Sequence, residues 1–206
     1  MEVHFTRISF AREEVSQLLE MENHIDDAVD LLSQAGVDII LFNCTTGSLV
    51  KGLGYDKLLI NKMESRSGVM SMTTATAVIM ALEHLQAKSI TLVTAYPKEI
   101  TEMESRFLEG NGFKVIKSVA AGISDPFEQA QRDPMFWFNY SKDNFDQNSD
   151  ALFISCAGIR VVEIISKLEK QIRIPIVTSN QAAMFACIRK LKLSSKVRGY
   201  GKLLYS

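Results

Sequence analysis

The sequence lacks the features that mark membrane, secreted and nucleic-acid-binding proteins. No apolar run approaches the roughly 18 residues that a membrane helix needs, and the N-terminus has no basic segment followed by an apolar one. The formal net charge is -1 and the lysines and arginines do not cluster, whereas nucleic-acid binding needs a basic footprint. We therefore expect a cytoplasmic protein with no membrane partner and no nucleic-acid partner.

Cysteine is also scarce, and its placement excludes two common structural uses. The chain has three cysteines, Cys44, Cys156 and Cys187, which is an odd number without any CxxC-type spacing. This pattern fits neither a disulfide framework nor a zinc site. Gly52 and Gly54 lack the third glycine and the downstream acidic residue of a nucleotide-binding fingerprint. We therefore expect no zinc ion and no nucleotide.

What the sequence does contain is a regular alternation of strand and helix patterns. The predicted strands span residues 3–9, 37–42, 89–94, 113–119, 151–155 and 174–178. The predicted helices span residues 11–35, with a break near residue 23, and residues 73–86, 97–109, 122–148, 161–171 and 181–191. Residues 51–71 are predicted as a loop. The alternation is typical of the α/β class, with βαβ units and a parallel sheet.

Two cysteines follow predicted strands in matching contexts. Residues 37–48 and 149–160 each run from an aspartate through an apolar strand to a cysteine, with a glycine two or three residues later. In open α/β sheets, ligands bind in the crevice beyond the carboxyl ends of the strands. We therefore predict that Cys44 and Cys156 belong to an active site. Cys187 lies inside an apolar helix pattern and is predicted to be a core residue.

Four motifs along the chain resemble those of a known enzyme family. They are Cys44-Thr45-Thr46-Gly47-Ser48, Thr94-Ala95-Tyr96-Pro97, Gly122-Ile123-Ser124-Asp125 and Ser155-Cys156-Ala157-Gly158. The family is the Asp/Glu racemase superfamily, within it the branch of maleate cis-trans isomerase and arylmalonate decarboxylase. The resemblance implies two pseudo-symmetric, flavodoxin-like α/β halves with the site in the cleft between them. We place the first half at residues 1–74 plus 180–206 and the second at residues 75–179.

The resemblance also implies how the site works. Such enzymes use no metal and no organic cofactor, and their substrate is a small mono- or dicarboxylate. In maleate isomerases, the cysteine matching Cys44 adds to the double bond as a thiolate, and the cysteine matching Cys156 protonates the adjacent carbon. The expected substrate-binding residues are Thr45, Thr46, Ser48, Tyr96, Ala157 and Gly158. We further expect a homo-oligomer, either a dimer or a tetramer.

Thiols suit this chemistry because their pKa can be adjusted by the protein. The ordinary cysteine pKa of roughly 8.5 falls at a helix N-terminus, where the helix dipole favours the thiolate. Cys44 and Cys156 are both predicted to lie just before helices, so we expect lowered pKa values. A carbon acid beside a carboxylate also needs preorganised hydrogen-bond donors, which the hydroxyl groups of the motifs supply.

Two alternative functions remain open. Arylmalonate decarboxylases use only the second cysteine, so one alternative is a decarboxylase that relies on Cys156 alone. Where maleate isomerases have a substrate-binding asparagine, this chain has Pro126, so a substrate other than maleate is also consistent with the sequence. The second alternative is a truncated, non-catalytic member that binds small carboxylates.

The second alternative arises from the start of the chain. Relatives begin with a strand and a loop that carry another substrate-binding asparagine, and residues 3–9 resemble the second strand of the family. We therefore expect the full-length protein to begin upstream, which leaves an empty strand position between residues 3–9 and 37–42. If residues 3–9 instead pair directly with residues 37–42, the chain is a self-consistent fold.

Overall fold

Two separate parallel sheets form the framework of the protein, whose computed structural model describes residues 2–194 and 196–205. The first sheet consists of β1 (Ile39–Phe42) and β2 (Met70–Thr73). The second has the order β4-β3-β5-β6, and its strands are β3 (Ser89–Thr94), β4 (Lys114–Ala120), β5 (Ala151–Ser155) and β6 (Ile176–Thr178). Every pair is parallel, which confirms the α/β class. The second sheet has the flavodoxin-like order 2-1-3-4.

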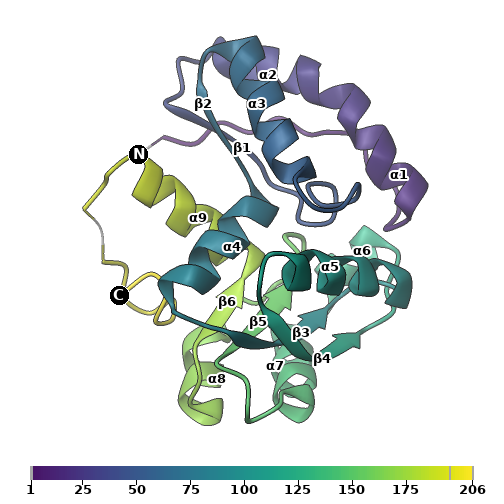
Figure 1. Cartoon of the computed structure of the whole chain (residues 1–206), viewed down its shortest axis with the longest axis vertical. Coiled ribbons are helices and arrows are strands. Elements are labelled where there is room, and N and C mark those ends of the chain that lie inside the picture. Colours follow the sequence, from purple (N-terminus) through teal and green to yellow (C-terminus); the bar gives the residue numbers. More distant parts are fainter. Residues whose placement is uncertain (1, 195, 206) are drawn as a thin grey trace.

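Helices cover both sheets (Figure 1). Beside the first sheet lie α1 (Val15–Glu20), the 3-10 helix η1 (Met21–His24), α2 (Ile25–Ser33) and α3 (Tyr55–Ser67). Around the second sheet lie α5 (Lys98–Gly110), α6 (Pro126–Gln131), α7 (Pro134–Asn144) and α8 (Ile165–Ile172). The helices α4 (Thr74–His84) and α9 (Ser179–Lys190) pack against each other, and each contacts strands of both sheets. This helix pair therefore connects the two sheets.

The helices α4 and α9 begin in the same way, which is the clearest internal repeat of the fold. β2 ends at Thr73, whose hydroxyl oxygen accepts a hydrogen bond from the Thr76 N–H in the first turn of α4. β6 ends at Thr178, whose hydroxyl oxygen accepts the Gln181 N–H at 3.2 Å. The Gln181 side chain in turn accepts the Thr178 N–H at 2.9 Å and completes a capping box. Each sheet thus contains one strand that ends at a capping threonine and leads directly into a helix.

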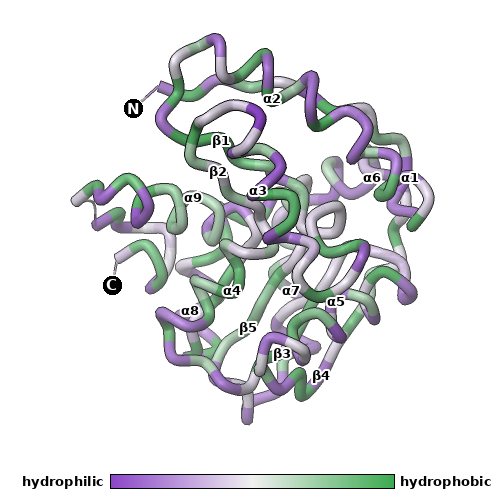
Figure 2. Tube along the Cα trace, turned by 45° about the horizontal axis from the view of Figure 1, so that its top comes forward, coloured by the Kyte–Doolittle hydropathy of each residue, from purple (hydrophilic) through white to green (hydrophobic). Residues whose placement is uncertain are grey.

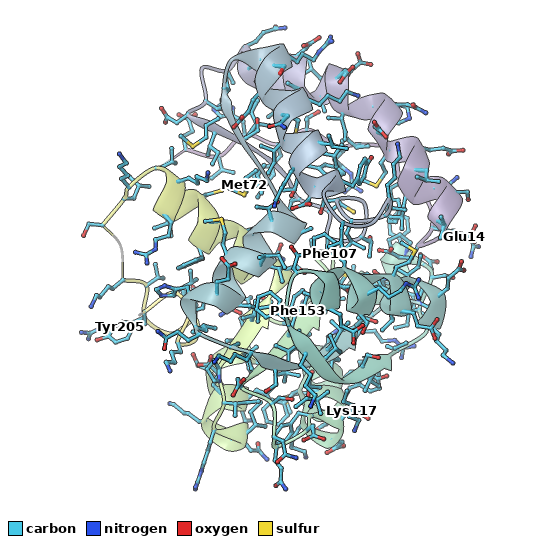
Figure 3. All side chains as sticks on the ribbon, in the orientation of Figure 1. Glu14, Met72, Phe107, Lys117, Phe153 and Tyr205 are labelled. Atoms are coloured by element: carbon cyan, nitrogen blue, oxygen red, sulfur yellow. The ribbon has the colours of Figure 1, made fainter. Side chains whose placement is uncertain are left out.

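The central strands of the second sheet carry much of the hydrophobic core. β5 is buried at every position, and β3 is buried at every position after Ser89. Phe153 on β5 lies in the interior (Figure 3), and Trp137 on α7 is also fully buried. Burial of one such side chain contributes roughly 1.5–3 kcal/mol. The outer helices α1 and α2 alternate between hydrophilic and hydrophobic residues (Figure 2), as expected for helices with one face on a core.

The N-terminal segment differs from the sequence prediction. Residues 3–9 form no strand, and Val3 and Phe5 are 53% and 89% exposed. Within the described residues β1 pairs only with β2, so the direct pairing of residues 3–9 with β1 does not occur. An alternating pattern is not sufficient for a strand, because the segment also needs a neighbouring strand edge to pair with.

Two further predictions concern the helices around the first sheet. Residues 51–71 were predicted as a loop but contain α3, because Tyr55, Leu59 and Met63 recur at helical spacing and are buried on one face. The predicted break near residue 23 is confirmed, since η1 separates α1 from α2.

The proposed domain division falls at the first residues of α4 and α9. It groups α9 with the first sheet and α4 with the second, although each of these helices contacts strands of both sheets. We retain this division as a proposal. In the described part of the chain, no helix is both long and apolar enough to cross a membrane.

Candidate active site

The first predicted cysteine lies in a tight turn directly after β1. β1 ends at Phe42, and Cys44 follows two residues later. The backbone N–H of Gly47 donates a hydrogen bond to the Cys44 Sγ at 3.3 Å. Glycine gives the closest fit at position 47, because a Cβ there would lie 3.0 Å from the Cys44 Sγ and 3.2 Å from the Phe42 Cζ. The turn therefore closes directly around the sulfur.

The second predicted cysteine follows β5 in a similar arrangement. The Gly158 N–H donates to the Cys156 Sγ at 3.3 Å, and the thiol lies 3.3 Å from the Gln129 Oε1, which accepts its hydrogen. The φ angle of Cys156 is 152°, a backbone conformation that residues with a Cβ rarely adopt. Such strain costs of order 1–3 kcal/mol and is concentrated at functional sites. Each sulfur thus accepts a backbone N–H from a glycine two or three residues later.

The first turn of α9 joins the two cysteine loops. The Ser179 Oγ accepts a hydrogen bond from the Thr45 hydroxyl at 2.8 Å and another from the Cys156 N–H at 3.1 Å. All three residues are buried. One oxygen atom of α9 therefore fixes the residue after the first cysteine and the backbone of the second.

Asparagine side chains form a second bridge between the same loops. The Asn43 Nδ2 donates to the Asn180 Oδ1 at 3.1 Å, and the Asn180 Nδ2 donates to the Ala157 carbonyl at 3.0 Å. The Thr74 hydroxyl donates to the Asn43 Oδ1 at 2.9 Å. The two bridges place the loops of Cys44 and Cys156 side by side, although the loops belong to different sheets.

Tyr96, the third predicted site residue, lies beside the second thiol. Tyr96 is 1% exposed and interacts electrostatically with Cys156, and its hydroxyl lies 3.3 Å from the Ser155 Oγ. Ser155 donates to the Glu104 Oε1 at 2.7 Å. A buried chain of hydrogen bonds therefore connects Tyr96 through Ser155 to the Glu104 carboxyl group.

Two buried glutamates near the thiols were not identified from the sequence. Glu13 is 5% exposed and accepts a hydrogen bond from the Thr46 hydroxyl at 3.2 Å, and Glu104 is fully buried. Burial raises the pKa of Glu13 to about 7 and the pKa of Glu104 to about 8. The Glu104 Oε2 has no hydrogen-bond partner within the described residues. Both carboxyl groups therefore titrate near neutral pH.

Only one of these two glutamates, Glu104, could have been recognised as buried from the sequence. Glu104 lies four residues after Ile100 and three before Phe107, which places it on the buried face of α5. A lone carboxylate on an apolar helix face is unusual and could have been found. Glu13 stands in a charged stretch before α1, where nothing distinguishes it from the exposed Glu14.

The expectation of lowered thiol pKa values is wrong. Burial raises the pKa of Cys44 to about 12 and also raises the pKa of Cys156, and the nearby Glu13 carboxylate raises both further. Neither cysteine directly precedes an α-helix, because hydrogen-bonded turns follow both. The predicted helix dipole is therefore not available at either sulfur. The Gly47 N–H and the Thr46 side chain lower the pKa of Cys44, and the Gly158 N–H lowers that of Cys156, but burial has the larger effect at both thiols.

The remaining predicted residues lie around these two loops. The Ser48 hydroxyl donates to the Cys44 carbonyl at 2.7 Å and accepts the Ala75 N–H at 3.1 Å, so it shapes the first turn. Ala157 is half-buried and Gly158 is exposed. The arrangement places their backbone at the open side of the second loop.

The structure leaves the predicted cleft between the thiols untested. A cavity of about 180 Å³ lies elsewhere, between α9 and the C-terminal segment, and is lined in part by Phe185, Leu193 and Leu203. In residues 2–194 and 196–205, no group of three His, Cys, Asp or Glu side chains is arranged to hold a metal ion. A cleft with room for a diacid between Cys44 and Cys156 therefore stays a prediction.

Relatives of this sequence are named either maleate isomerase or arylmalonate decarboxylase. The chain is 27% identical over 207 residues to a maleate isomerase from Pseudomonas putida (strain KT2440), which covers 98% of this chain and 83% of that protein. It is 25% identical over 211 residues to a maleate isomerase from Geobacillus stearothermophilus, with coverage of 98% and 82%. It is 26% identical over 186 residues to an arylmalonate decarboxylase from Bordetella bronchiseptica, with coverage of 89% and 77%.

Solved structures that carry the same two activity names share the fold over nearly the whole chain. The maleate isomerase Iso from Pseudomonas putida S16 matches with a TM-score of 0.95 at 26% identity and covers 98% of this chain and 84% of that chain. A structure of arylmalonate decarboxylase matches with a TM-score of 0.81 at 22% identity, which shows the fold alone, with coverage of 94% and 85%. The family model described as arylmalonate decarboxylase matches residues 2–204, and the chain therefore belongs to this family of enzymes.

Proposed function

We propose that the protein is a cofactor-independent isomerase of a small carboxylate, similar to maleate cis-trans isomerase, with a cysteine on each side of the substrate. The observation that carries the proposal is the shared anchor at Ser179, which holds the loops of both cysteines together. Relatives named maleate isomerase support it over 98% of the chain. A Nocardia farcinica maleate cis-trans isomerase variant with a covalently bound succinylcysteine intermediate has the same fold, at 22% identity and a TM-score of 0.95.

The reaction needs a nucleophile and a proton donor on opposite faces of a double bond. The Cys44 thiolate adds to one alkene carbon, and the Cys156 thiol gives its proton to the adjacent carbon, so the double bond becomes a single bond. This bond rotates. Cys156 then takes a proton back from the same carbon, the carbon–sulfur bond breaks, and both thiols regain their initial states. No net oxidation or reduction takes place.

Hydroxyl and backbone donors bind the carboxylates of the substrate in this proposal. Thr45 and Thr46 are placed in this role through their backbone N–H groups, because their hydroxyl hydrogens point to Ser179 and Glu13. The Tyr96 hydroxyl is buried near Cys156, and the backbone of Ala157 and Gly158 lies at the more open side. These donors stabilise the negative charge that develops on the substrate carboxylate when the alkene carbons react. Ser48 supports them by holding the turn that carries Thr45 and Thr46.

The second candidate is an arylmalonate decarboxylase that uses Cys156 alone. The family description and the Bordetella bronchiseptica relative favour it. In this reaction the substrate loses carbon dioxide, donors such as Tyr96 stabilise the resulting enediolate, and Cys156 protonates its carbon. Cys44 has no chemical role in that scheme.

Substrate screening with cysteine variants separates the candidates. Maleate and phenylmalonate are incubated with the wild type, Cys44→Ala, Cys156→Ala and the control Cys187→Ala, and the products are followed by proton NMR in deuterated water. We expect fumarate from maleate with the wild type and Cys187→Ala, and none with the two site variants. Phenylacetate formation that survives Cys44→Ala would replace the isomerase by the decarboxylase. Binding of maleate without turnover of either compound would support a non-catalytic carboxylate-binding protein.

Two broader expectations remain proposals. A homo-oligomer, a dimer or tetramer, is tested by light scattering on the purified chain. A cytoplasmic location is tested by fractionation of the source cells.

A further inference from the structure

The carboxyl group of Glu13 has no role in the proposed reaction, although it lies next to the nucleophilic thiol. Glu13 precedes α1, and its backbone N–H donates to the Ser124 carbonyl at 2.9 Å. This bond anchors the residue to the loop before α6. The side chain is 5% exposed, so a charged group has been brought into the protein interior. Burial of a carboxylate is costly, and its position therefore calls for an explanation.

A threonine connects this carboxyl group to Cys44. The Thr46 hydroxyl donates its hydrogen to the Glu13 Oε2 at 3.2 Å, and the Thr46 Oγ1 lies 3.7 Å from the Cys44 Sγ. Because the one hydrogen of Thr46 points to the carboxylate, its lone pairs are free to accept the thiol hydrogen. The three side chains thus form a chain in which every hydrogen points from sulfur toward carboxylate.

We propose that Glu13 accepts the Cys44 proton through the Thr46 hydroxyl and so generates the thiolate nucleophile. The Thr46 proton moves to the Glu13 Oε2 while the Cys44 proton moves to the Thr46 Oγ1. The products are a neutral carboxylic acid, an unchanged threonine and a thiolate that accepts the Gly47 N–H. This inference rests on the proposed function only in giving Cys44 the role of nucleophile.

The charges around Glu13 explain why an internal acceptor is needed. The ionisable groups that face Glu13 are Cys44, Cys156, Tyr96 and Glu104. Every one of them is negative when ionised, so loss of the Cys44 proton to bulk water would place a second anion beside the Glu13 carboxylate. Proton transfer from Cys44 through Thr46 to Glu13 moves the existing negative charge from the carboxylate to the sulfur without adding another. The Glu13 pKa of about 7 means that the carboxylate is available as an acceptor above neutral pH. Because the Cys44 pKa is about 12, the form with the proton on Glu13 is a minor population that the reaction draws on.

A purely structural role for Glu13 makes a different prediction. If the side chain only accepts the Thr46 hydrogen bond, Glu13→Gln preserves the function, since the amide oxygen of glutamine is also an acceptor. A proton acceptor, in contrast, changes how the Cys44 thiolate population depends on pH. The pH profile of thiol reactivity therefore distinguishes the two roles.

The test measures alkylation of Cys44 by iodoacetamide between pH 6 and 9, with the modified peptide quantified by mass spectrometry. In the wild type, the rate rises tenfold per pH unit below pH 7 and levels off above it. Above pH 7, Cys44 and Glu13 together hold one proton, and a further pH increase does not change how that proton is distributed between them. In Glu13→Gln, the rate rises tenfold per pH unit throughout. Glu14→Gln is the matched control, because Glu14 is exposed at the outer margin of the molecule (Figure 3) and caps nothing with its side chain; it keeps the wild-type profile.

A wild-type rate that rises tenfold per unit through pH 9 without levelling off would overturn the proposal, even if Glu13→Gln failed to fold. Equal profiles in the wild type and a folded Glu13→Gln would also overturn it. The assay contains no substrate, so its outcome is independent of maleate turnover. If the alkylation rate levels off but the protein does not isomerise maleate, the proton transfer to Glu13 is supported and only the proposed function is contradicted.

Discussion

The Thr45 hydroxyl donates a hydrogen bond to the Ser179 Oγ at 2.8 Å and thereby links a turn of the first sheet to the helix that follows the last strand of the second. Ser179 also accepts the Cys156 N–H. Ser179→Ala leaves two buried donors without a partner, which costs about 1–3 kcal/mol of folding free energy. We expect lower stability in urea unfolding together with a loss of turnover. The control Ser16→Ala, at an exposed position on α1, is expected to stay within about 0.5 kcal/mol of the wild type. Equal stability of the two variants would contradict the anchoring role.

Tyr96→Phe removes the hydroxyl that lies beside Cys156 and keeps the buried ring. If this hydroxyl donates to the substrate carboxylate, the variant loses about 3 kcal/mol of transition-state stabilisation, or roughly a hundred- to thousandfold in kcat. The measurement is kcat for maleate with the wild type, Tyr96→Phe and the control Tyr200→Phe, whose side chain is largely exposed. A kcat of Tyr96→Phe within threefold of the control would remove Tyr96 from the set of substrate donors.

Glu104 is expected to make stability depend on pH. Burial raises its pKa from 4.5 to about 8, so between these values the unfolded chain has lost a proton that the folded protein keeps. Stability from this group is therefore fully present below pH 4.5 and is lost as the pH rises toward 8, at about 1.4 kcal/mol per pH unit. Urea unfolding at pH 5.5 and 7.5 should show a steeper decline in the wild type than in Glu104→Gln.

The exposed Glu109 on the same helix supplies the control for this measurement. Glu109→Gln removes one carboxyl group but should keep the wild-type decline between pH 5.5 and 7.5. If Glu104→Gln and Glu109→Gln declined equally, the buried carboxyl group would be ionised in the folded protein and its raised pKa would be refuted.

The two glycines that donate to the sulfurs should respond differently to alanine. A Cβ at Gly47 would lie 3.0 Å from the Cys44 Sγ and 3.2 Å from the Met21 Sδ, so these side chains must shift to make room for it. A Cβ at Gly158 would lie 3.6 Å from the Cys156 Sγ, which is an ordinary contact. We expect Gly47→Ala to lower the unfolding free energy by about 1–3 kcal/mol and Gly158→Ala to change it little. Thermal unfolding of both variants measures this difference. If Gly158→Ala were less stable than Gly47→Ala, the turn around Cys44 would be more loosely packed than described.

The sequence was sufficient to predict the elements whose patterns are strong. The strands before Cys44 and Cys156 form as expected, because runs of β-branched and other apolar residues suit parallel strands. β5 is buried at every position, whereas β1 is buried only at alternate positions and not on both faces as predicted. The region of α3 was missed because its apolar residues are interspersed with charged and polar ones, and because the glycines, serines and lysines of residues 51–71 suggested a loop. Residues 3–9 were wrongly predicted as a strand because the pattern of a single segment contains no information about a pairing partner.

The electrostatics of the site could not be predicted from the sequence. The position of Cys44 and Cys156 at strand ends followed from local patterns, but the rise in their pKa values comes from burial and from the Glu13 carboxylate. Ser179 and Glu13 reach the site through tertiary contacts with residues far away in the chain. Their roles depend on distances that no local pattern specifies.

The contacts of α9 also have a consequence for how the protein is made. The β1–β2 pair contains two strands of four residues each, and a sheet of this size is marginal without a helix against it. One of the helices that contact it is α9, the last helix of the chain. α2 and α3 also contact this sheet and are synthesised before α9. During synthesis on the ribosome, the first sheet can therefore pack against α2 and α3 early, but it gains its contacts with residues 179–190 only after the strands of the second sheet have been made. The α9 contacts are thus the last to form, and they join two sheets whose strands are already present.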